Sequence, residues 1–188
     1  MLGPQIDCGQ KEIATVNYTI TLTPTQLCHL KKCREWFNDP RITRYFPRIC
    51  TVNEETELDW YKRITASKSD IIWSIMLQEG SNKHHVGQTG IRSIDWINGT
   101  GDTGTTIDPQ WWNKGIATIA MKARGKFAFG QLRLSALYTE ICPENVHSIR
   151  AAETAGYEKY GIKPYFIFRD GQYLSSWLGV LTPRTLKG

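Results

Sequence analysis

Residues 109–118 read Pro109-Gln110-Trp111-Trp112-Asn113-Lys114-Gly115-Ile116-Ala117-Thr118, and they join a strand-like pattern to a helical one. Apolar residues after this stretch recur at the spacing of one helix face as far as residue 129. A helix that begins at a glycine turn presents unpaired backbone N–H groups and the positive end of its dipole. We therefore expect a phosphate-bearing ligand to bind at this helix N-terminus.

The patterns on either side of this stretch predict a mixed fold. Turn residues and β-type runs indicate strands over residues 15–22, 71–77, 86–96, 103–107, 134–141, 157–160, 165–168 and 173–181. Helical spacing indicates helices over residues 27–36, 51–64, 115–129 and 145–155. Together they predict an α/β (α+β) architecture with a mixed, mostly antiparallel central sheet of about seven strands, flanked by helices on both faces.

Two local signals refine this prediction. The helix over residues 51–64 is expected to begin at a capping box of Thr51 and Glu54, and its early acids are interpreted as partners of the helix dipole rather than as catalysts. Asp170-Gly171 lies between two β-type runs and predicts a tight hairpin turn. The early acids of the helix predicted over residues 51–64 are Glu54, Glu55, Glu57 and Asp59.

Length and composition favour a single domain over residues 1–188. The chain is 40% hydrophobic and 22% charged, which is enough apolar material for a core. Residues 1–12 contain Gly3, Pro4 and Gly9 with little pattern, so they are expected to be a loosely ordered lead-in. No run approaches the roughly 20 apolar residues of a membrane helix, and no signal-peptide pattern opens the chain.

The net charge of +5 favours an anionic partner, such as nucleic acid, an acidic protein surface or a polyphosphate cofactor. The basic residues are scattered, and Lys122, Arg124 and Lys126 resemble a solvated helix face, which argues against a nucleic-acid groove. The five cysteines form no CxxC pair and the histidines lack ligand spacing, so we expect neither a disulfide framework nor a metal site. This cysteine usage fits a reducing cytoplasm.

Two motifs at a matched distance carry a specific resemblance. Residues 112–117 correspond to the loop R/Q-x-x-G-x-G/A, with Trp112 in place of the usual Arg or Gln. A downstream pattern of Asn-x-x-Ser, a Gly-aromatic pair and another Gly is present as Asn145, Ser148, Gly156-Tyr157 and Gly161. With these motifs the chain resembles the GNAT superfamily of N-acetyltransferases, and is most similar to the branch of ribosomal-protein N-terminal and spermidine acetyltransferases.

The resemblance implies acetyl-CoA as the acyl donor and no metal. It places the pyrophosphate on the glycine loop, and the pantetheine arm and thioester carbonyl on backbone amides at the end of the preceding strand. Aromatic residues of the first two helices and their loop would shape the acceptor cleft, although core packing is the alternative for each. The implied cofactor residues are Thr106, Ile107, Asp108, Trp112, Asn113, Lys114, Gly115, Ile116, Ala117, Thr118 and Asn145, and the implied acceptor residues are Trp36, Tyr45, Trp60 and Trp111.

The acid and base of the reaction are less defined. Ala152 occupies the position where many relatives carry a tyrosine that protonates the departing thiolate, so another acid is needed. Ser148 is the candidate, with the alternative that it only bonds the backbone or CoA. Glu140 and Asp108 are candidate bases, with the alternatives that Glu140 points to solvent and that Asp108 caps a turn.

These observations predict a cytoplasmic acyltransferase that acetylates a primary amine by direct attack in a ternary complex. The acceptor is expected to be a protein N-terminus, a polyamine or another small amine, with the basic surface disfavouring a polycation. Nucleic acid is expected only as part of an acceptor, membranes are not expected, and a homodimer through the last strands is plausible. The alternative is a non-catalytic acyl-CoA-binding or RNA-associated module, which Ala152 permits.

Overall fold

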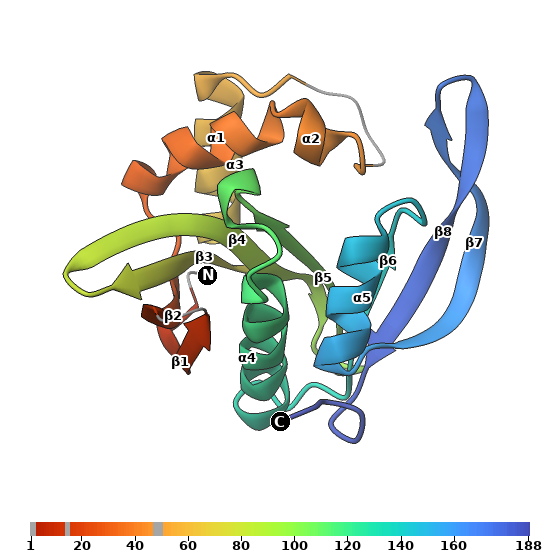
Figure 1. Cartoon of the computed structure of the whole chain (residues 1–188). Coiled ribbons are helices and arrows are strands. Elements are labelled where there is room, and N and C mark those ends of the chain that lie inside the picture. The colour runs from red at the N-terminus through yellow and green to blue at the C-terminus, as the bar shows by residue number, and fades with distance from the viewer. Residues whose placement is uncertain (1–2, 14–15, 47–50) are drawn as a thin grey trace.

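A computed structural model describes residues 3–13, 16–46 and 51–188. Within these ranges one eight-stranded sheet has the order β1-β2-β3-β4-β5-β6-β8-β7 (Figure 1). The strands are β1 Ile6–Ile13, β2 Val16–Pro24, β3 Ile71–Glu79, β4 Asn82–Asp95, β5 Thr100–Ile107, β6 Ala136–Ile141, β7 Glu158–Arg169 and β8 Gln172–Leu181. The helices are η1 Leu27–His29, α1 Leu30–Phe37, α2 Pro40–Thr43, α3 Glu54–Ala66, η2 Pro109–Trp111, α4 Ile116–Gly130 and α5 Val146–Ala155.

The predicted architecture is confirmed, because the sheet is mixed, mostly antiparallel and flanked by helices. Its two faces are seen in β3, where alternate side chains point in opposite directions. Trp73 packs edge-on against Phe127 of α4, with ring centroids 5.5 Å apart. Ser74, one residue later, lies 2.8 Å from Nδ1 of His29, just before α1. Helices α4 and α1 therefore cover opposite faces.

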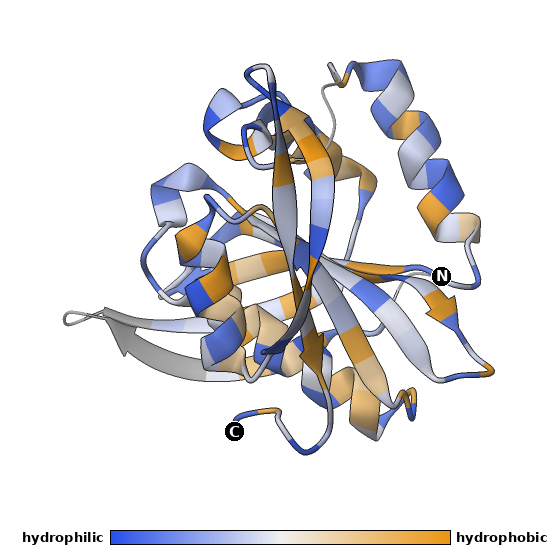
Figure 2. Ribbon diagram, turned by 90° about the vertical axis from the view of Figure 1, so that its right-hand side faces the viewer, coloured by the Kyte–Doolittle hydropathy of each residue, from blue (hydrophilic) through white to orange (hydrophobic). Residues whose placement is uncertain are grey.

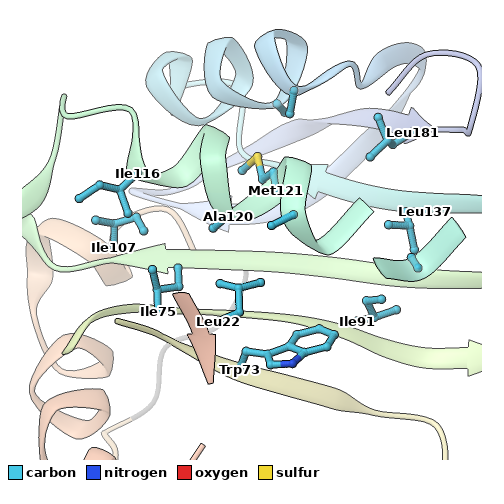
Figure 3. Close-up of a cluster of buried hydrophobic side chains, with 14 of the residues drawn as sticks. Leu22, Trp73, Ile75, Ile91, Ile107, Ile116, Ala120, Met121, Leu137 and Leu181 are labelled. Atoms are coloured by element: carbon cyan, nitrogen blue, oxygen red, sulfur yellow. The ribbon is translucent and has the colours of Figure 1, made fainter. Parts of the chain in front are cut away.

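The main core lies between α4 and the sheet. Ile116, Ala120 and Met121 of α4 point toward the strands, where they meet side chains such as Ile75 and Ile107 (Figure 3). Ile116 and Ala120 are almost fully buried. The axis of α4 is thereby fixed against the sheet, and with it the position of its first turn.

The expected lead-in is wrong for residues 6–12. Ile6–Ile13 form β1, which pairs antiparallel with β2 and has a register shift around Gly9, whose φ is +83°. Ile6 and Cys8 both pack against the main core, as a strand with a two-residue period requires. Polar residues and a glycine bulge obscured this period in the sequence.

The start of α3 also differs from the prediction. The capping box is formed by Asn53 and Thr56, because the Asn53 side chain accepts a hydrogen bond from the Thr56 N–H at 2.8 Å. Thr51 lies outside the helix, so its predicted pairing with Glu54 is wrong.

The hairpin at the C-terminal end follows the prediction. Asp170 and Gly171 have φ values of +48° and +76°, the left-handed pair that a two-residue hairpin turn needs. The two strands expected over residues 157–160 and 165–168 form one bulged strand, β7. The hairpin projects past α5 and carries hydrophobic stretches (Figures 1 and 2). Arg169 Nη2 donates to the carbonyl of Phe46 at 2.8 Å, which connects the hairpin to the segment after α2.

Gly156 provides a test of this fold. It ends α5 with φ +112°, and a Cβ there would meet the backbone carbonyl of Thr185. We expect Gly156→Ala to lower the free energy of unfolding by about 2 kcal/mol or more, because both strain and crowding are added. Urea denaturation measures it. Gly130→Ala is the control, since a Cβ there meets nothing within 4 Å; an equal loss in both variants would contradict the assignment.

Candidate active site

A cleft of about 1400 Å³ opens where β5 and β6 diverge. Their parallel register extends only from Thr100↔Ala136 to Asp102↔Tyr138, whereas β5 continues to Ile107 and β6 to Ile141. The continuing segments line the cleft, together with the first turn of α4 and one side of α5. Small-molecule sites usually measure about 300–1,000 Å³, so this cleft has room for two reactants.

The first turn of α4 is built for an anion. Gly115 is its N-cap with φ +73°, and no side chain caps the helix. The N–H groups of Ile116, Ala117 and Thr118 are therefore left for a ligand. Asn113, also left-handed with φ +61°, turns the chain toward this glycine. The geometry fits the predicted pyrophosphate group.

The loop before α4 is held from both ends. The Tyr18 hydroxyl donates to the carbonyl of Lys114 at 3.0 Å, and Trp112 Nε1 donates to the carbonyl of Ile107 at 2.8 Å. The Lys114 ammonium lies 4.4 Å from the centre of the Trp111 ring. The predicted loop residues from Trp111 to Thr118 thus come together at the cleft, and Lys114 is the one that does not line it.

The strand amides require a correction. The Asp108 N–H is donated to the carbonyl of Val86 at 2.9 Å, so it is not free for a ligand. Backbone N–H groups along an antiparallel pair alternate in direction. The N–H of Thr106 therefore points toward β4, as the N–H of Asp108 does. Ile107 and Thr105 have the opposite orientation and direct their amides into the divergence between β5 and β6.

Asp108 itself has a structural role. Its carboxylate accepts from the Gln110 N–H at 3.0 Å at the start of η2, and Lys32 Nζ lies 3.5 Å from it. The side chain is buried and does not line the cleft. The turn-capping alternative is confirmed, and the prediction of Asp108 as a cofactor ligand through its amide is wrong.

Asn145 and Ser148 meet at the start of α5. Asn145 accepts a hydrogen bond from the Ser148 N–H at 3.2 Å as the helix N-cap. Both residues line the cleft and Ser148 is half-buried, whereas Ala152, one turn later, is fully buried. Ser148 is therefore a hydroxyl on the cleft side of α5.

Of the remaining predicted residues, some line the cleft and one lies in a separate core cluster. Glu140 lines the cleft but is exposed and lies 3.4 Å from Lys163 Nζ. Tyr45 and Trp60 line the cleft as expected. Trp36 does not, because it is 3% exposed and packs with Cys33 and Ile42 in a separate core cluster. Its predicted role in the acceptor cleft is wrong.

Glu57 is a site residue that the sequence interpretation missed. It is 2% exposed and lines the cleft. Neither carboxylate oxygen has a hydrogen-bond partner among the residues that the structure describes. Burial raises the pKa of Glu57 to about 7, against the opposing effect of Arg34, whose Nη1 lies 3.7 Å away. Glu57 shares one helix face with Trp60 and Ile64, and this spacing is the signal that could have identified it.

Arg124 was also misassigned, since it is 1% exposed rather than part of a solvated face. Its guanidinium reaches the inner end of the cleft, where Nη2 donates to the Tyr157 hydroxyl at 2.9 Å. The Tyr157 hydroxyl in turn lies 2.9 Å from Thr103 Oγ1. In the sequence, Arg124 lies between Lys122 and Lys126 on a long helix, and nothing in this pattern indicated its burial.

The structure also bears on membrane-spanning helices and on metal sites. In the described ranges no helix is long and apolar enough to cross a membrane. In the same part of the chain no group of three or more His, Cys, Asp or Glu side chains could hold a metal ion.

The diverging parallel strand pair and the uncapped, glycine-led helix at its mouth are the arrangement expected of an N-acyltransferase. The chain belongs to the acetyltransferase (GNAT) domain family, whose model matches residues 19–158. The resemblance inferred from the motifs is thereby confirmed.

Individual proteins agree with this membership. The chain is 23% identical over 163 residues to the uncharacterized N-acetyltransferase p20 of Bacillus licheniformis, covering 83% of this chain and 88% of that protein. Its fold is similar to the spermidine N-acetyltransferase of Vibrio cholerae solved with CoA and spermine, with a TM-score of 0.80, 17% identity and coverage of 88% and 96% of the two chains. The fold is also similar to a GNAT-family acetyltransferase of Bacillus anthracis, with a TM-score of 0.74 and 20% identity over 87% of this chain and 94% of that one.

The Glu57 environment generates a prediction about pH. A folded-state pKa near 7, above the ordinary 4.5, means that the stability of the protein falls as pH rises through this interval. Glu57→Gln removes this dependence, so its melting temperature relative to wild type should increase between pH 5 and pH 8. Glu54→Gln is the control, because Glu54 also lies 3.7 Å from Arg34 but is exposed. If both variants respond to pH alike, the buried-carboxylate assignment fails.

Proposed function

We propose that the protein is an acetyl-CoA-dependent N-acetyltransferase that transfers the acetyl group to a primary amine by direct attack in a ternary complex. The observation that carries this proposal is the uncapped, glycine-led N-terminus of α4 at the mouth of the β5/β6 divergence. The residues present fit a CoA pyrophosphate at the first turn of α4. Asn145 and Ser148 of α5 would face the same ligand from the other side.

The chain's own groups can support each step of the transfer. The amine attacks the thioester carbonyl, and the inward-facing N–H of Ile107 would stabilise the resulting oxyanion. The thiolate leaves as the tetrahedral intermediate collapses, and Ser148 is the proposed donor of its proton, which the Ser148 hydroxyl regains from solvent. A thiol pKa of about 8.5 means that modest assistance is sufficient.

The proton that the amine loses needs an acceptor at neutral pH. Glu57, with a pKa of about 7, is matched to this task and is the stronger of two candidate bases. Glu140 is the other, but it is exposed and paired with Lys163. Both residues line the cleft.

The acceptor that we propose is a small amine, with polyamines included. Glu57 lies on the cleft with Trp60 and Tyr45, and anionic and aromatic groups together suit an ammonium group. Two similar folds are spermidine N-acetyltransferases. A cytoplasmic location is consistent with the free thiols Cys8, Cys28, Cys33 and Cys142, while Cys50 lies outside the described residues.

Donor binding is tested by Gly115→Glu. A carboxylate at this position would oppose the CoA phosphates, so calorimetric titration should show at least about tenfold weaker binding of acetyl-CoA, or about 1.4 kcal/mol. Gly171→Glu is the matched control, because Gly171 is also left-handed, at φ +76°, with open space around it. Wild-type protein that binds neither acetyl-CoA nor CoA would refute the enzyme proposal.

The acid is tested by Ser148→Ala, assayed with a panel of amines at saturating acetyl-CoA. Loss of a proton donor should lower kcat by about tenfold or more, whereas loss of a CoA contact alone would raise KM for acetyl-CoA and leave kcat unchanged. Ser81→Ala, in the exposed turn between β3 and β4, is the control. Acetyl-CoA binding without turnover of any amine by the wild type would favour a non-catalytic module.

A further inference from the structure

The inner end of the cleft contains a buried cation, the guanidinium of Arg124, which is 1% exposed. Within the described part of the chain, the hydrogen-bond partners of the Arg124 guanidinium are all neutral. Nη1 donates to Thr89 Oγ1 at 2.6 Å, to the Gly104 carbonyl at 2.9 Å and to Thr105 Oγ1 at 3.0 Å. A guanidinium removed from water without a carboxylate partner is costly.

The hydrogen-bonding capacity of Arg124 is not used up. Among residues 3–13, 16–46 and 51–188, Nε has no partner, and Nη2 makes one bond, to the Tyr157 hydroxyl at 2.9 Å. Nη2 carries two N–H groups and Nε carries one. The Nε/Nη2 edge therefore retains donors on the fork that binds a carboxylate through two parallel hydrogen bonds.

The position of this edge relates it to the acyl donor. Arg124 comes from α4, on the sheet face opposite α1, and it contacts β5 at Gly104 and Thr105. The strands converge toward Asp102 and Tyr138, so these contacts lie deeper in the divergence than Ile107. Two residues of strand, about 7 Å, separate Ile107 from Thr105. A four-carbon acyl chain and one hydrogen bond of about 2.8 Å cover that span.

The lining of the inner end is polar. Thr89, Thr103 and Tyr157 are buried and contribute hydroxyl groups, and all three line the cleft with Arg124. These hydroxyl groups already have partners, since Thr89 Oγ1 lies 3.2 Å from the Gly104 carbonyl oxygen and Thr103 Oγ1 donates to the Tyr138 carbonyl at 2.8 Å. The donors that the lining leaves without a partner among the described residues belong to Arg124. An apolar acyl chain would leave these guanidinium donors unpaired, whereas an anionic chain would accept from them.

We propose that Arg124 forms a carboxylate subsite at the inner end of the donor cleft, so that the enzyme accepts dicarboxylic acyl-CoA thioesters, such as succinyl-CoA, in addition to acetyl-CoA. This inference rests on the proposed function, because it assigns the acyl end of the same cleft. The carboxylate lies against Nε and Nη2 of Arg124, and Tyr157 retains its hydrogen bonds to Arg124 and Thr103. The acyl transfer itself is unchanged, since the distal carboxylate takes no part in it.

Calorimetric titration of the whole chain with CoA, acetyl-CoA, succinyl-CoA and butyryl-CoA tests the subsite. Succinyl and butyryl groups have the same number of carbons and differ by the terminal carboxylate. We expect succinyl-CoA to bind at least about tenfold more tightly than butyryl-CoA, as a charged hydrogen bond at a buried site would give. No amine is present, so an effect of the terminal carboxylate cannot come from an acceptor.

Variants assign the effect to Arg124. Arg124→Met should remove the preference for succinyl-CoA while CoA binding remains, and Tyr157→Phe should retain the preference because the cation is kept. Circular dichroism and thermal melting establish that each variant is folded. If Arg124→Met does not fold, the affinities of wild-type protein for succinyl-CoA and butyryl-CoA still decide whether the cleft contains a carboxylate subsite.

The outcomes separate this inference from the proposed function. Equal binding of succinyl-CoA and butyryl-CoA to the wild type, with normal CoA binding, overturns the subsite and leaves the acetyltransferase proposal intact. A preference that survives in folded Arg124→Met also overturns it. Absence of binding by CoA and every thioester overturns both.

Discussion

The short parallel pairing of β5 and β6 is the constraint on which the rest of the site depends. Only the segment from Thr100 to Asp102 is in register with β6, and beyond it the strands separate. Helix α4 connects the two strands. The segment that leaves β5 where the strands separate therefore places the N-terminus of α4 at the mouth of the cleft. The packing of Ile116 and Ala120 against the sheet keeps that N-terminus in place. Donor recognition is therefore a direct product of the topology.

The parts that could be predicted from sequence are those encoded locally. Gly115 and the helical spacing after it indicated the α4 N-terminus, and Asp170-Gly171 indicated the last hairpin, because backbone conformation there depends on a few adjacent residues. The strand β1 was missed because its stability comes from pairing with β2 rather than from its own composition. Trp36 was misplaced for a related reason, since no local signal distinguishes an aromatic residue of a cleft from one of a core.

The charges were the least predictable feature. Glu57 and Arg124 both occur in helices with other charged residues, and sequence alone suggested a partner of the helix dipole for Glu57 and a solvated position for Arg124. Tertiary packing buries both, one on α3 and one on α4, on opposite faces of the sheet. The cleft is thus lined by a buried carboxyl group from one face and a buried guanidinium from the other. Burial of this kind is decided by contacts between elements far apart in the chain, which no single window of sequence contains.

The sheet order has a consequence for folding. The last strand, β8, lies between β6 and β7 instead of at an edge, and it pairs with both. During synthesis β6 therefore keeps an unpaired backbone edge until the residues of β8 leave the ribosome, and nascent chains are exposed to edge-to-edge association in that interval. The wall of the cleft that β6 provides becomes permanent only when β8 inserts. Shortening the chain by that one strand would therefore expose β6 and weaken a wall of the cleft that lies far from the cut in sequence.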